Sequence, residues 1–430
     1  MAEDGQIRTV SQLGQWHGGG TPSKAVASYW DGDIPWVSPK DMTGGAIRDT
    51  LDRLTKAGAA TLELHPPGAI AVVFRSGILR RAFPVARGAV PFTVNQDLKV
   101  LHPGPKVDAG YAFHVLRGLE RRVVGSAVKS GTTVESVDSA VFYQMPVYVP
   151  QLVEQRAIAE ILDTVDEAIH STEQLIAKLE RMQEGLLNDL LTRGVGENGE
   201  LRDPERHPEL FKHAALGWVP RQWDVQPFGQ ITHSALLGTG VRGVDPLGDN
   251  LNLLKMGNLG WGLIDVADIE PVARGRVPDW PDLVLEHGDL LFNTRNTPAL
   301  VGKTVAWRAS LGKETIADNN ILRVRFDGRA NGQFIAAYMA HGEGRRRVGQ
   351  LATGTTSVAA VYWKSLRRFR VPLPPRAEQD EIVVRVRGIE ELVTAENGVL
   401  RKLRLLNGGV AQDLLTGRVR VTGLLEGDAA

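Results

Sequence analysis

The chain has 430 residues, 43% of them hydrophobic, and its 50 basic and 50 acidic side chains give a formal net charge of zero. This composition provides for two to four domains and excludes a membrane protein, because no apolar run is long enough to span a bilayer. The absence of cysteine excludes disulfides and cysteine-ligated zinc, and because the N-terminus has no export signal we expect a cytoplasmic protein.

Charge is distributed unevenly along the chain. Residues 1–150 carry 16 basic and 13 acidic side chains, residues 215–372 carry 19 and 14, and residues 151–193 carry 4 and 9. Positive charge therefore lies outside the central acidic stretch. This pattern is expected if the two basic regions face a polyanion, although a solvated mixed surface explains the charge equally well.

The first region, residues 1–148, mixes short β-branched runs with turn residues. Gly68 to Phe74 and Leu98 to Pro103 predict strands. Tyr111 to Arg122 predicts a helix, with Asp108 as its N-cap. We expect an α+β domain.

Residues 149–193 are predicted to form one long helix. Apolar side chains recur at spacings of three and four, with one polar interruption at Thr172-Glu173. The helix has a single apolar seam and therefore needs a partner. The positions expected to contact that partner are Ile158, Leu162, Val165, Ile169, Ile176, Leu179 and Leu186.

The long helical segment occurs twice. Adding 224 to each number carries Glu154–Thr192 onto Glu378–Thr416 without a gap, and both copies begin with Glu-Gln and end with Asp-Leu-Leu-Thr. The second copy belongs to a predicted helix over residues 373–420, followed by a tail at 421–430. Its expected contact positions are Ile382, Val386, Ile389, Val393, Leu400, Leu403 and Val410.

The region before the second helix repeats the first region more loosely. Residues 194–214 are rich in Gly, Pro and charge and predict a linker, and residues 215–372 predict a second domain. Asn319 to Val324 aligns with Asn95 to Val100 at a shift of 224. The sequence therefore predicts an α+β tandem duplication, in which two similar α/β domains are joined by two long helices and related by a pseudo-two-fold axis.

Glycines in the second helix complicate this prediction. Gly388, Gly398 and Gly408 have no glycine at the matching positions of the first helix, and the Asn-Gly pairs there suggest a kink or break. Gly409 matches Gly185 and suggests a close approach of the two backbones.

Signatures of catalysis are missing from the sequence. The glycine-rich runs Gly18–Gly20 and Gly238–Gly240 do not continue into a phosphate-binding loop and are better explained by loop geometry. The ten histidines are scattered, so we predict no metal site. Asp282 and Glu286 lack the lysine of a metal-dependent nuclease and are interpreted as surface charges. We expect a protein that is not an enzyme.

Several segments resemble the specificity subunit of type I restriction-modification systems. The resemblance covers the full length in the order of its parts. The segments that carry it are Ile34–Met42, Pro150–Ile169, Asn188–Gly194, Leu216–Trp223, Gly288–Asn296, Pro372–Gln379 and Gln412–Val421.

This resemblance implies a function in DNA recognition. Each globular part would be a target recognition domain that reads one half of a bipartite sequence in double-stranded DNA. The two helices would form an antiparallel coiled coil that sets the spacer and docks two methyltransferase (M) subunits. Restriction (R) subunits would join the complex for cleavage. The chain itself would bind no cofactor, and S-adenosylmethionine, ATP and Mg²⁺ would belong to the partner subunits.

Polar loops that occur in both halves are the expected DNA contacts. Hydroxyl, amide and cationic side chains and exposed backbone N–H groups suit phosphates and base edges. For the glycine-threonine loops, a turn that closes a strand is an equally good explanation, as a surface or loop-stabilising role is for each other residue. The candidates are Lys40, Arg75, Lys129, Gly131, Thr132, Thr133, Lys255, Asn293, Arg295, Asn296, Asn319, Gly354, Thr355 and Thr356.

Arg345-Arg346-Arg347 is a sharper basic cluster, typical of a solvated helix end or of phosphate contact without sequence information. Two other classes of function compete with DNA specificity. One is a coiled-coil scaffold whose globular ends bind protein, and the other is a cryptic nuclease. DNA binding distinguishes the first from a specificity subunit, and a need for partner subunits distinguishes the second.

Overall fold

The computed structural model describes residues 5–129, 134–308, 311–355 and 357–421. The chain divides into two compact units, and each unit takes part of each long helix. The first unit comprises Met1–Gln174 and Gly398–Ala430, and the second comprises Leu175–Asn397. Among the described residues, no helix is both long and apolar enough to cross a membrane.

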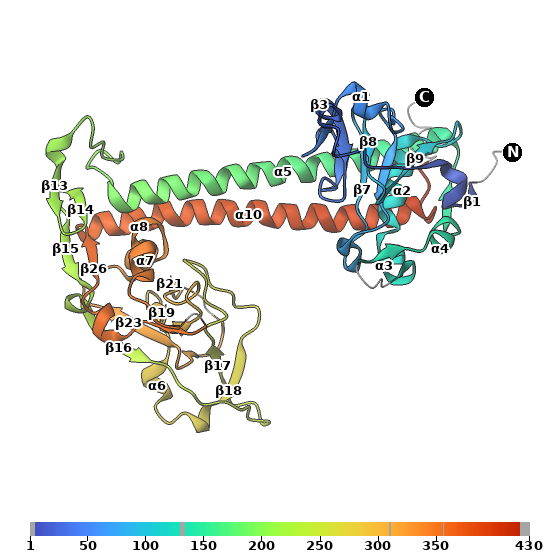
Figure 1. Ribbon diagram of the computed structural model, residues 1–430. Coiled ribbons are helices and arrows are strands. Elements are labelled where there is room, and N and C mark those ends of the chain that lie inside the picture. Colours follow the sequence, from blue (N-terminus) through green and yellow to red (C-terminus); the bar gives the residue numbers. More distant parts are fainter. Residues whose placement is uncertain (1–4, 130–133, 309–310, 356, 422–430) are drawn as a thin grey trace, which may run out of the picture. The chain divides into compact units, whose positions relative to one another are not determined.

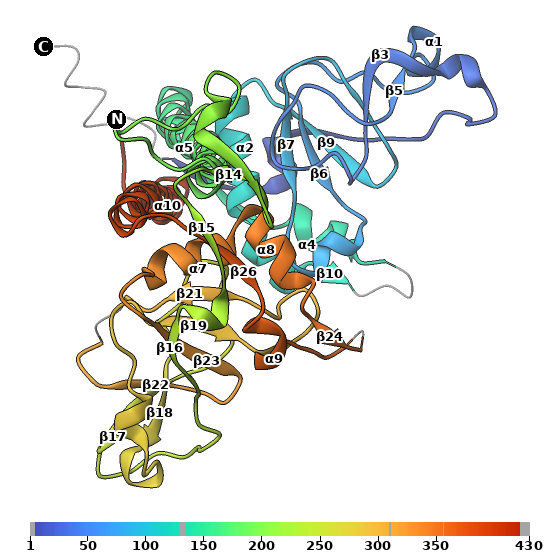
Figure 2. The same ribbon diagram turned by 90° about the vertical axis from the view of Figure 1, so that its left-hand side faces the viewer.

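The first unit is built on a five-stranded sheet in the order β2-β9-β6-β7-β4. Neighbouring strands are antiparallel except for β4 and β7. All four residues of β6 are buried, and α2 packs beside β7 (Figure 2). The helix expected over residues 111–122 is two helices, because the first ends at Gly118. Asp108 caps its first turn by accepting from the Tyr111 backbone N–H, as predicted.

The elements of the first unit are β1 (Gln6–Thr9), β2 (Gly14–Gly18), β3 (Trp30–Val37), β4 (Gly45–Ile47), β5 (Arg53–Leu54), α1 (Lys56–Ala59), β6 (Ile70–Val73), β7 (Val85–Gly88), β8 (Thr93–Val94), β9 (Leu98–Pro103), α2 (Ala109–Gly118), α3 (Glu120–Ser126), β10 (Val128–Lys129), β11 (Ser136–Val137), α4 (Ser139–Tyr143) and β12 (Pro146–Val149).

The second unit repeats this plan around a four-stranded antiparallel sheet in the order β16-β23-β19-β21. Its elements are β13 (Phe211–Ala214), β14 (Gly217–Pro220), β15 (Asp224–Pro227), β16 (Thr232–Leu237), β17 (Asn250–Leu254), β18 (Glu270–Ala273), α6 (Trp280–Leu283), β19 (Leu290–Asn293), β20 (Arg295–Asn296), β21 (Thr304–Ala306), β22 (Thr315–Ala317), β23 (Ile321–Phe326), α7 (Gly332–Ala340), α8 (Gly342–Gly349), β24 (Thr353–Gly354), β25 (Ala359–Ala360), α9 (Trp363–Leu366) and β26 (Arg370–Leu373).

Strand registers correct the predicted alignment of the two domains by one residue. Ile70 pairs with Leu101 in the first unit, and Leu290 pairs with Val324 in the second. Residues of β6 match residues of β19 that lie 220 positions later in the sequence. With that match, residues of β9 match residues of β23 that lie 223 positions later, and not 224 positions as predicted. The turns before these strands agree, because Asn95 and Asp318 each accept a hydrogen bond from the backbone N–H two residues later.

The glycine runs are explained by close backbone approach. A Cβ on Gly19 would lie 2.2 Å from the Val94 carbonyl oxygen, and one on Gly238 would lie 2.0 Å from that of Ala317. Both glycines follow the strand that pairs with β9 or β23. Loop geometry is thus confirmed as the reason for these residues.

The two long helices are α5 (Leu152–Thr192) and α10 (Arg376–Leu415) (Figure 1). In the first unit the start of α5 packs with the end of α10, and Asn407 Nδ2 donates to Asp166 Oδ1 at 2.8 Å. In the second unit the end of α5 shares a core with the start of α10, through Leu187 and Ile382. The helices are therefore antiparallel.

Most positions predicted for the seam are removed from solvent. Buried positions are Ile158, Leu162, Ile176, Ile382, Val386 and Leu400, and partly buried positions are Val165, Ile169, Leu179, Ile389, Val393, Leu403 and Val410. Leu186 corrects the prediction, since it is 36% exposed whereas Leu187 is 2% exposed. At the end of α5 the apolar stripe turns toward the domain core, because Leu187, Leu190 and Leu191 all pack there.

The glycine predictions for α10 are also corrected. The helix runs without a break from Arg376 to Leu415. Within the described residues, a Cβ at Gly185 or Gly409 would meet nothing within 4 Å, so neither marks a close backbone approach. The same holds at Gly388 and Gly398.

Candidate nucleic-acid interface

Several predicted contact residues of the second unit lie on one small sheet, in the order β20-β25-β24. Arg295 pairs with Ala360 and Gly354 pairs with Ala359. The sheet thus brings together Arg295, Asn296, Gly354 and Thr355, although 59 positions separate Arg295 from Gly354 in the sequence. Thr356 lies outside the described residues.

The Gly354-Thr355 turn has a structural role of its own. Gly354 has a φ of 148°, and a Cβ there would lie 2.3 Å from the Val358 carbonyl oxygen. The Thr355 backbone N–H donates to that oxygen at 2.8 Å, and Thr355 Oγ1 accepts from the Val358 N–H at 3.3 Å. The turn is therefore fixed locally, and it leaves Thr355 exposed at the end of the hairpin.

Asn293 corrects the prediction of a base contact. Its side chain is 0% exposed. Its amide nitrogen donates to the carbonyl oxygens of Arg295 at 3.1 Å and Asn320 at 3.2 Å, and its Oδ1 accepts from Asn296 Nδ2 at 3.0 Å. These bonds hold the loop that presents Arg295, and a fully buried amide does not reach a base edge.

Two other predicted asparagines differ in exposure. Asn296 is partly buried, and its Oδ1 also accepts from the Thr297 N–H at 2.8 Å. Asn319 is exposed, and its backbone N–H donates to the Thr239 carbonyl oxygen. The Oδ1 of Asn319 accepts from Asn320 Nδ2 at 3.4 Å, and the exposed side chain is still accessible to a ligand.

The first unit places two predicted cations in the equivalent position. Arg75 forms a bridge with Ser136 of β11, and Lys129 of β10 pairs with the same serine. Arg75 corresponds to Arg295 at the shift of 220 set by β6 and β19. Gly131, Thr132 and Thr133 follow Lys129 directly and lie outside the described residues.

The predicted lysines differ in their surroundings. Lys129 is 66% exposed, and its Nζ lies 2.6 Å from an oxygen of Asp138, whose pKa this hydrogen bond lowers. Lys255 forms an ion pair with Glu270 and lowers the pKa of that carboxyl in the same way. Lys40 is exposed in the turn after β3. Of these lysines, Lys129 and Lys255 already have an acidic partner.

The arginine run lies on α8 and is held by its own domain. The Arg345 guanidinium lies 4.3 Å from the centre of the Trp261 ring, and that of Arg347 lies 5.3 Å from the centre of Phe369. Arg346 pairs with Glu343 on the same helix. The sequence indicated the cluster but not these partners, because Trp261 is 84 positions away.

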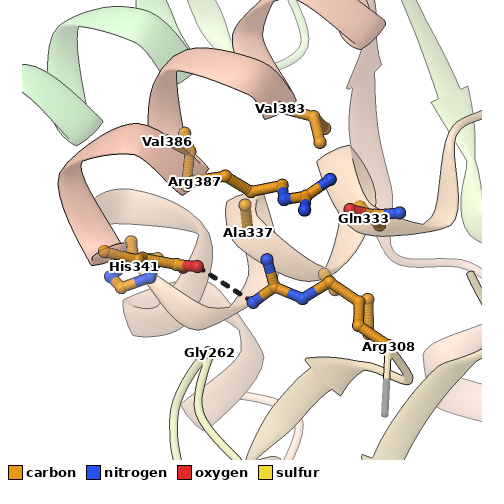
Figure 3. A pocket seen from close by; sticks show the side chains of 11 residues that line it. Gly262, Arg308, Gln333, Ala337, His341, Val383, Val386 and Arg387 are labelled. Atoms are coloured by element: carbon orange, nitrogen blue, oxygen red, sulfur yellow. Dashed lines mark hydrogen bonds and ion pairs between the residues drawn. The ribbon is translucent and has the colours of Figure 1, made fainter. Parts of the chain in front are cut away.

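The carboxylates considered for a nuclease have ordinary roles. Glu286 pairs with Arg325 at 2.9 Å, and the Asp282 backbone carbonyl accepts from the buried Arg323 at 2.7 Å. A cavity beside α7 and α10, lined by Arg308, Gln333, His341 and Arg387 among others, measures about 20 Å³ (Figure 3). This is room for roughly one water molecule, and an ion pair between Arg308 and Glu390 crosses it.

One cluster escaped the sequence analysis altogether. His17, Glu63 and His102 offer ligand atoms that all lie within 4.8 Å of one another, so two of the ten histidines meet in the fold. His65 is 0% exposed beside them, with its Nδ1 2.9 Å from His102 Nε2. Burial lowers the pKa of His65 to about 4 and also lowers the pKa of His102. No spacing motif could indicate this group, because its members come from three separate segments.

Comparison with known proteins finds similarity to the specificity subunits of type I restriction enzymes. The family described as "Type I restriction modification DNA specificity domain" matches residues 2–181. The specificity subunit of the type I restriction enzyme EcoR124I/EcoR124II from Escherichia coli is 36% identical over 187 residues, which cover 42% of this chain and 46% of that protein. The MjaVIII specificity subunit from Methanocaldococcus jannaschii is 22% identical over 426 residues, which cover 99% and 95%.

Solved structures show the same fold. The S subunit of a type I restriction-modification system from M. genitalium superposes with a TM-score of 0.57 at 13% identity, covering 96% of each chain. A second structure, described under the assembly and conformational transition of the type I R-M system, gives a TM-score of 0.54 at 16% identity and covers 97% of this chain.

Proposed function

Because the chain is similar to type I restriction-modification specificity subunits, we propose that each of its two units reads one half of a bipartite target in double-stranded DNA. The chain is a DNA-specificity component and not a catalytic one. The observation that carries the proposal is the duplicated presentation of cations. Arg75 and Lys129 stand beside β11 in the first unit, and Arg295 stands beside β25 in the second.

The chemistry of these residues suits DNA. Arginine binds guanine bidentately in the major groove and also binds phosphates, and lysine binds phosphates as a point charge. Both domains carry an excess of positive charge, so they attract the duplex before any base is read. The Gly354-Thr355 turn adds a hydroxyl on the same sheet as Arg295. Each unit therefore combines residues for positioning on the backbone with residues for reading bases.

The helices supply the second part of the proposal. We infer that α5 and α10 set the spacer between the two half-sequences and dock two M subunits, to which R subunits are added for cleavage. Both helices keep large apolar side chains in solvent, including Met182 at 59% and Leu405 at 72% exposure. Exposed apolar residues on a helix favour a protein partner. S-adenosylmethionine, ATP and Mg²⁺ would act in those partner subunits.

A hybrid protein tests independent reading by the two units. Residues 1–146 are replaced by the matching domain of a relative with a different target, and the DNA methylated in cells with the M subunits is mapped by sequencing. We expect one half of the recognised sequence to change, while the other half and the spacer stay the same.

The matched control exchanges residues 215–372 instead, and it should change the opposite half. A hybrid that alters both halves together would contradict independent reading. If the unmodified chain did not bind DNA in the presence of its M subunits, this result would instead support a coiled-coil scaffold.

A further inference from the structure

The histidine cluster of the first unit is assembled by the sheet and one connecting segment. β2 and β9 are antiparallel, with Gln15 opposite His102 and His17 opposite Val100. His17 and His102 therefore project from the same face as diagonal neighbours, and their rings stack with centres 4.1 Å apart. The segment with Glu63 and His65 lies beside them. Its backbone forms a bridge from His65 to Phe92, and the His65 ring contacts the His102 ring.

The donor atoms converge. His17 Nδ1 lies 2.8 and 2.9 Å from the two oxygens of Glu63. His65 Nδ1 lies 2.9 Å from His102 Nε2 and so fixes the orientation of the His102 ring.

The second unit shows that the fold itself does not need these histidines. The paired strands place Leu236 where the first unit has His17, and Arg325 where it has His102. Leu285 occupies the position of His65, since each donates its backbone N–H to the equivalent strand. The same strand pairing thus forms with leucines in two of these places, so the pairing itself does not require the histidines.

We propose that His17, Glu63 and His102 bind one divalent metal ion of the zinc class, with His65 as the residue that positions the His102 ring. Imidazole and carboxylate donors suit Zn²⁺, and a three-residue set leaves a fourth position for water. A hydrogen bond that orients a ligating histidine is the usual support of such a site.

To take the ion, donor atoms that lie within 4.8 Å of one another must adjust to tetrahedral spacing. Bonds of about 2.0–2.1 Å in a tetrahedral site separate two donor atoms by roughly 3.3 Å. The gap of 2.8 Å between His17 and Glu63 is shorter by about half an ångström. The Glu63 side chain is 44% exposed and can move outward by that amount. The ion would tie β2, β9 and the segment 63–65 together, close to the Gly18–Gly20 loop.

The test is direct metal binding by the untagged full-length chain. Chelator-treated protein is dialysed and titrated with Zn²⁺ in a calorimeter, and bound metal is counted by mass spectrometry. We expect about one equivalent, with a rise in Tm of roughly 5 °C or more once Zn²⁺ exceeds its Kd a hundredfold. Co²⁺ in place of Zn²⁺ should give the visible absorption of a four-coordinate site.

Variants that copy residues of the second unit separate binding from folding. His17→Leu, which copies Leu236 of the second unit, combined with the uncharged His102→Gln should fold and should lose the Zn²⁺ equivalent. Glu63→Gln, at an exposed position, should weaken binding, and His65→Leu should weaken it about 10-fold through loss of positioning.

His170→Gln, at an exposed position on α5, is the matched control and should bind like the unmodified chain. Absence of stoichiometric Zn²⁺ in the unmodified protein would overturn the proposal, and so would full binding by both the double variant and Glu63→Gln.

Discussion

The Glu-Gln pair near the start of each long helix makes the same kinds of contact in both units. Gln155 Oε1 accepts from the Asp108 N–H at 2.8 Å, and Gln379 Oε1 accepts from the Asn331 N–H at 2.7 Å. Each amide nitrogen also donates to two backbone carbonyls, one of them five residues earlier. Because Asp108 and Asn331 cap α2 and α7, the glutamines fasten the long helices to their domains.

The glutamates of these pairs receive arginines from the end of the other helix. Arg420, beyond α10, contacts both oxygens of Glu154 at 2.7 and 2.8 Å. Arg202, beyond α5, contacts both oxygens of Glu378, which also accepts from Trp223 Nε1 at 3.1 Å. The sequence showed that the glutamates repeat. It did not show the arginines, because they follow the helices at different distances and Arg202 lies in a segment expected to be a linker.

Removing Arg202 tests this buried pair. The side chains of Arg202 and Glu378 are both 8% exposed, so Arg202→Met leaves a buried carboxylate without its cation. We expect a loss of about 3 kcal/mol in the free energy of unfolding, measured by urea denaturation. Arg206→Met removes an arginine that is 83% exposed, and it should change stability by less than about 0.5 kcal/mol. Equal losses in the two variants would show that the pair is not important for stability.

At the scale of elements, the sequence predicted what depends on local pattern and missed what depends on contacts between distant segments. Apolar periodicity indicated both helices and most of their seam. It placed Leu186 in the seam because periodicity does not register where a helix leaves its partner and meets a domain. Asn293 was predicted to contact adenine because the sequence shows neither its burial nor its hydrogen bond to Asn320, which is 27 positions away. His17, Glu63 and His102 are likewise far apart along the chain and adjacent in the sheet.

The end of α5 offers a test with neighbouring residues. Leu187→Asp places a charge among Leu190, Leu191 and Ile382 in the core of the second unit. We expect it to destabilise the chain by about 3 kcal/mol or more in urea unfolding. Leu186→Asp changes an exposed residue on the same turn and should stay within about 0.5 kcal/mol. If Leu186→Asp were the more damaging of the two, the assignment of the buried face would be incorrect.

At the scale of the whole molecule, the chain is a duplication in which the two halves exchange helix ends. The first unit includes the C-terminal part of α10, and the second unit includes the C-terminal part of α5. The division falls at Gln174/Leu175 in α5 and at Asn397/Gly398 in α10, which differ by 223 positions, one fewer than the shift of 224 between the helices. Each helix contributes to both cores, and each glutamate at a helix start is held by an arginine beyond the other helix. The residues that hold each helix end in a domain core therefore affect both the stability of the chain and any role of the helices in setting the spacer.

Lengthening the helices tests whether they set the spacer. Ala-Glu-Ala-Leu is inserted between Thr172 and Glu173, near the division of the two units, and the same four residues are inserted at the matching place between Glu396 and Asn397. Four residues turn a helix by about 400°, so the seam drifts by only about 40°, and each helix lengthens by roughly 6 Å. At about 3.4 Å per base pair this equals one to two base pairs. We expect the double insertion to keep both half-sequences and to lengthen the spacer by that amount.

The two single insertions show how much an unchanged partner helix absorbs, and each should lengthen the spacer by no more than the double insertion does. Insertion of the same residues between Asn198 and Gly199, in the turn after α5, is the control and should leave the spacer unchanged. Single-molecule methylation sequencing in cells with the M subunits measures all four proteins. Full activity of the double insertion at the original spacing would mean that the helices do not set the distance. Altered half-sequences would mean that they take part in reading bases.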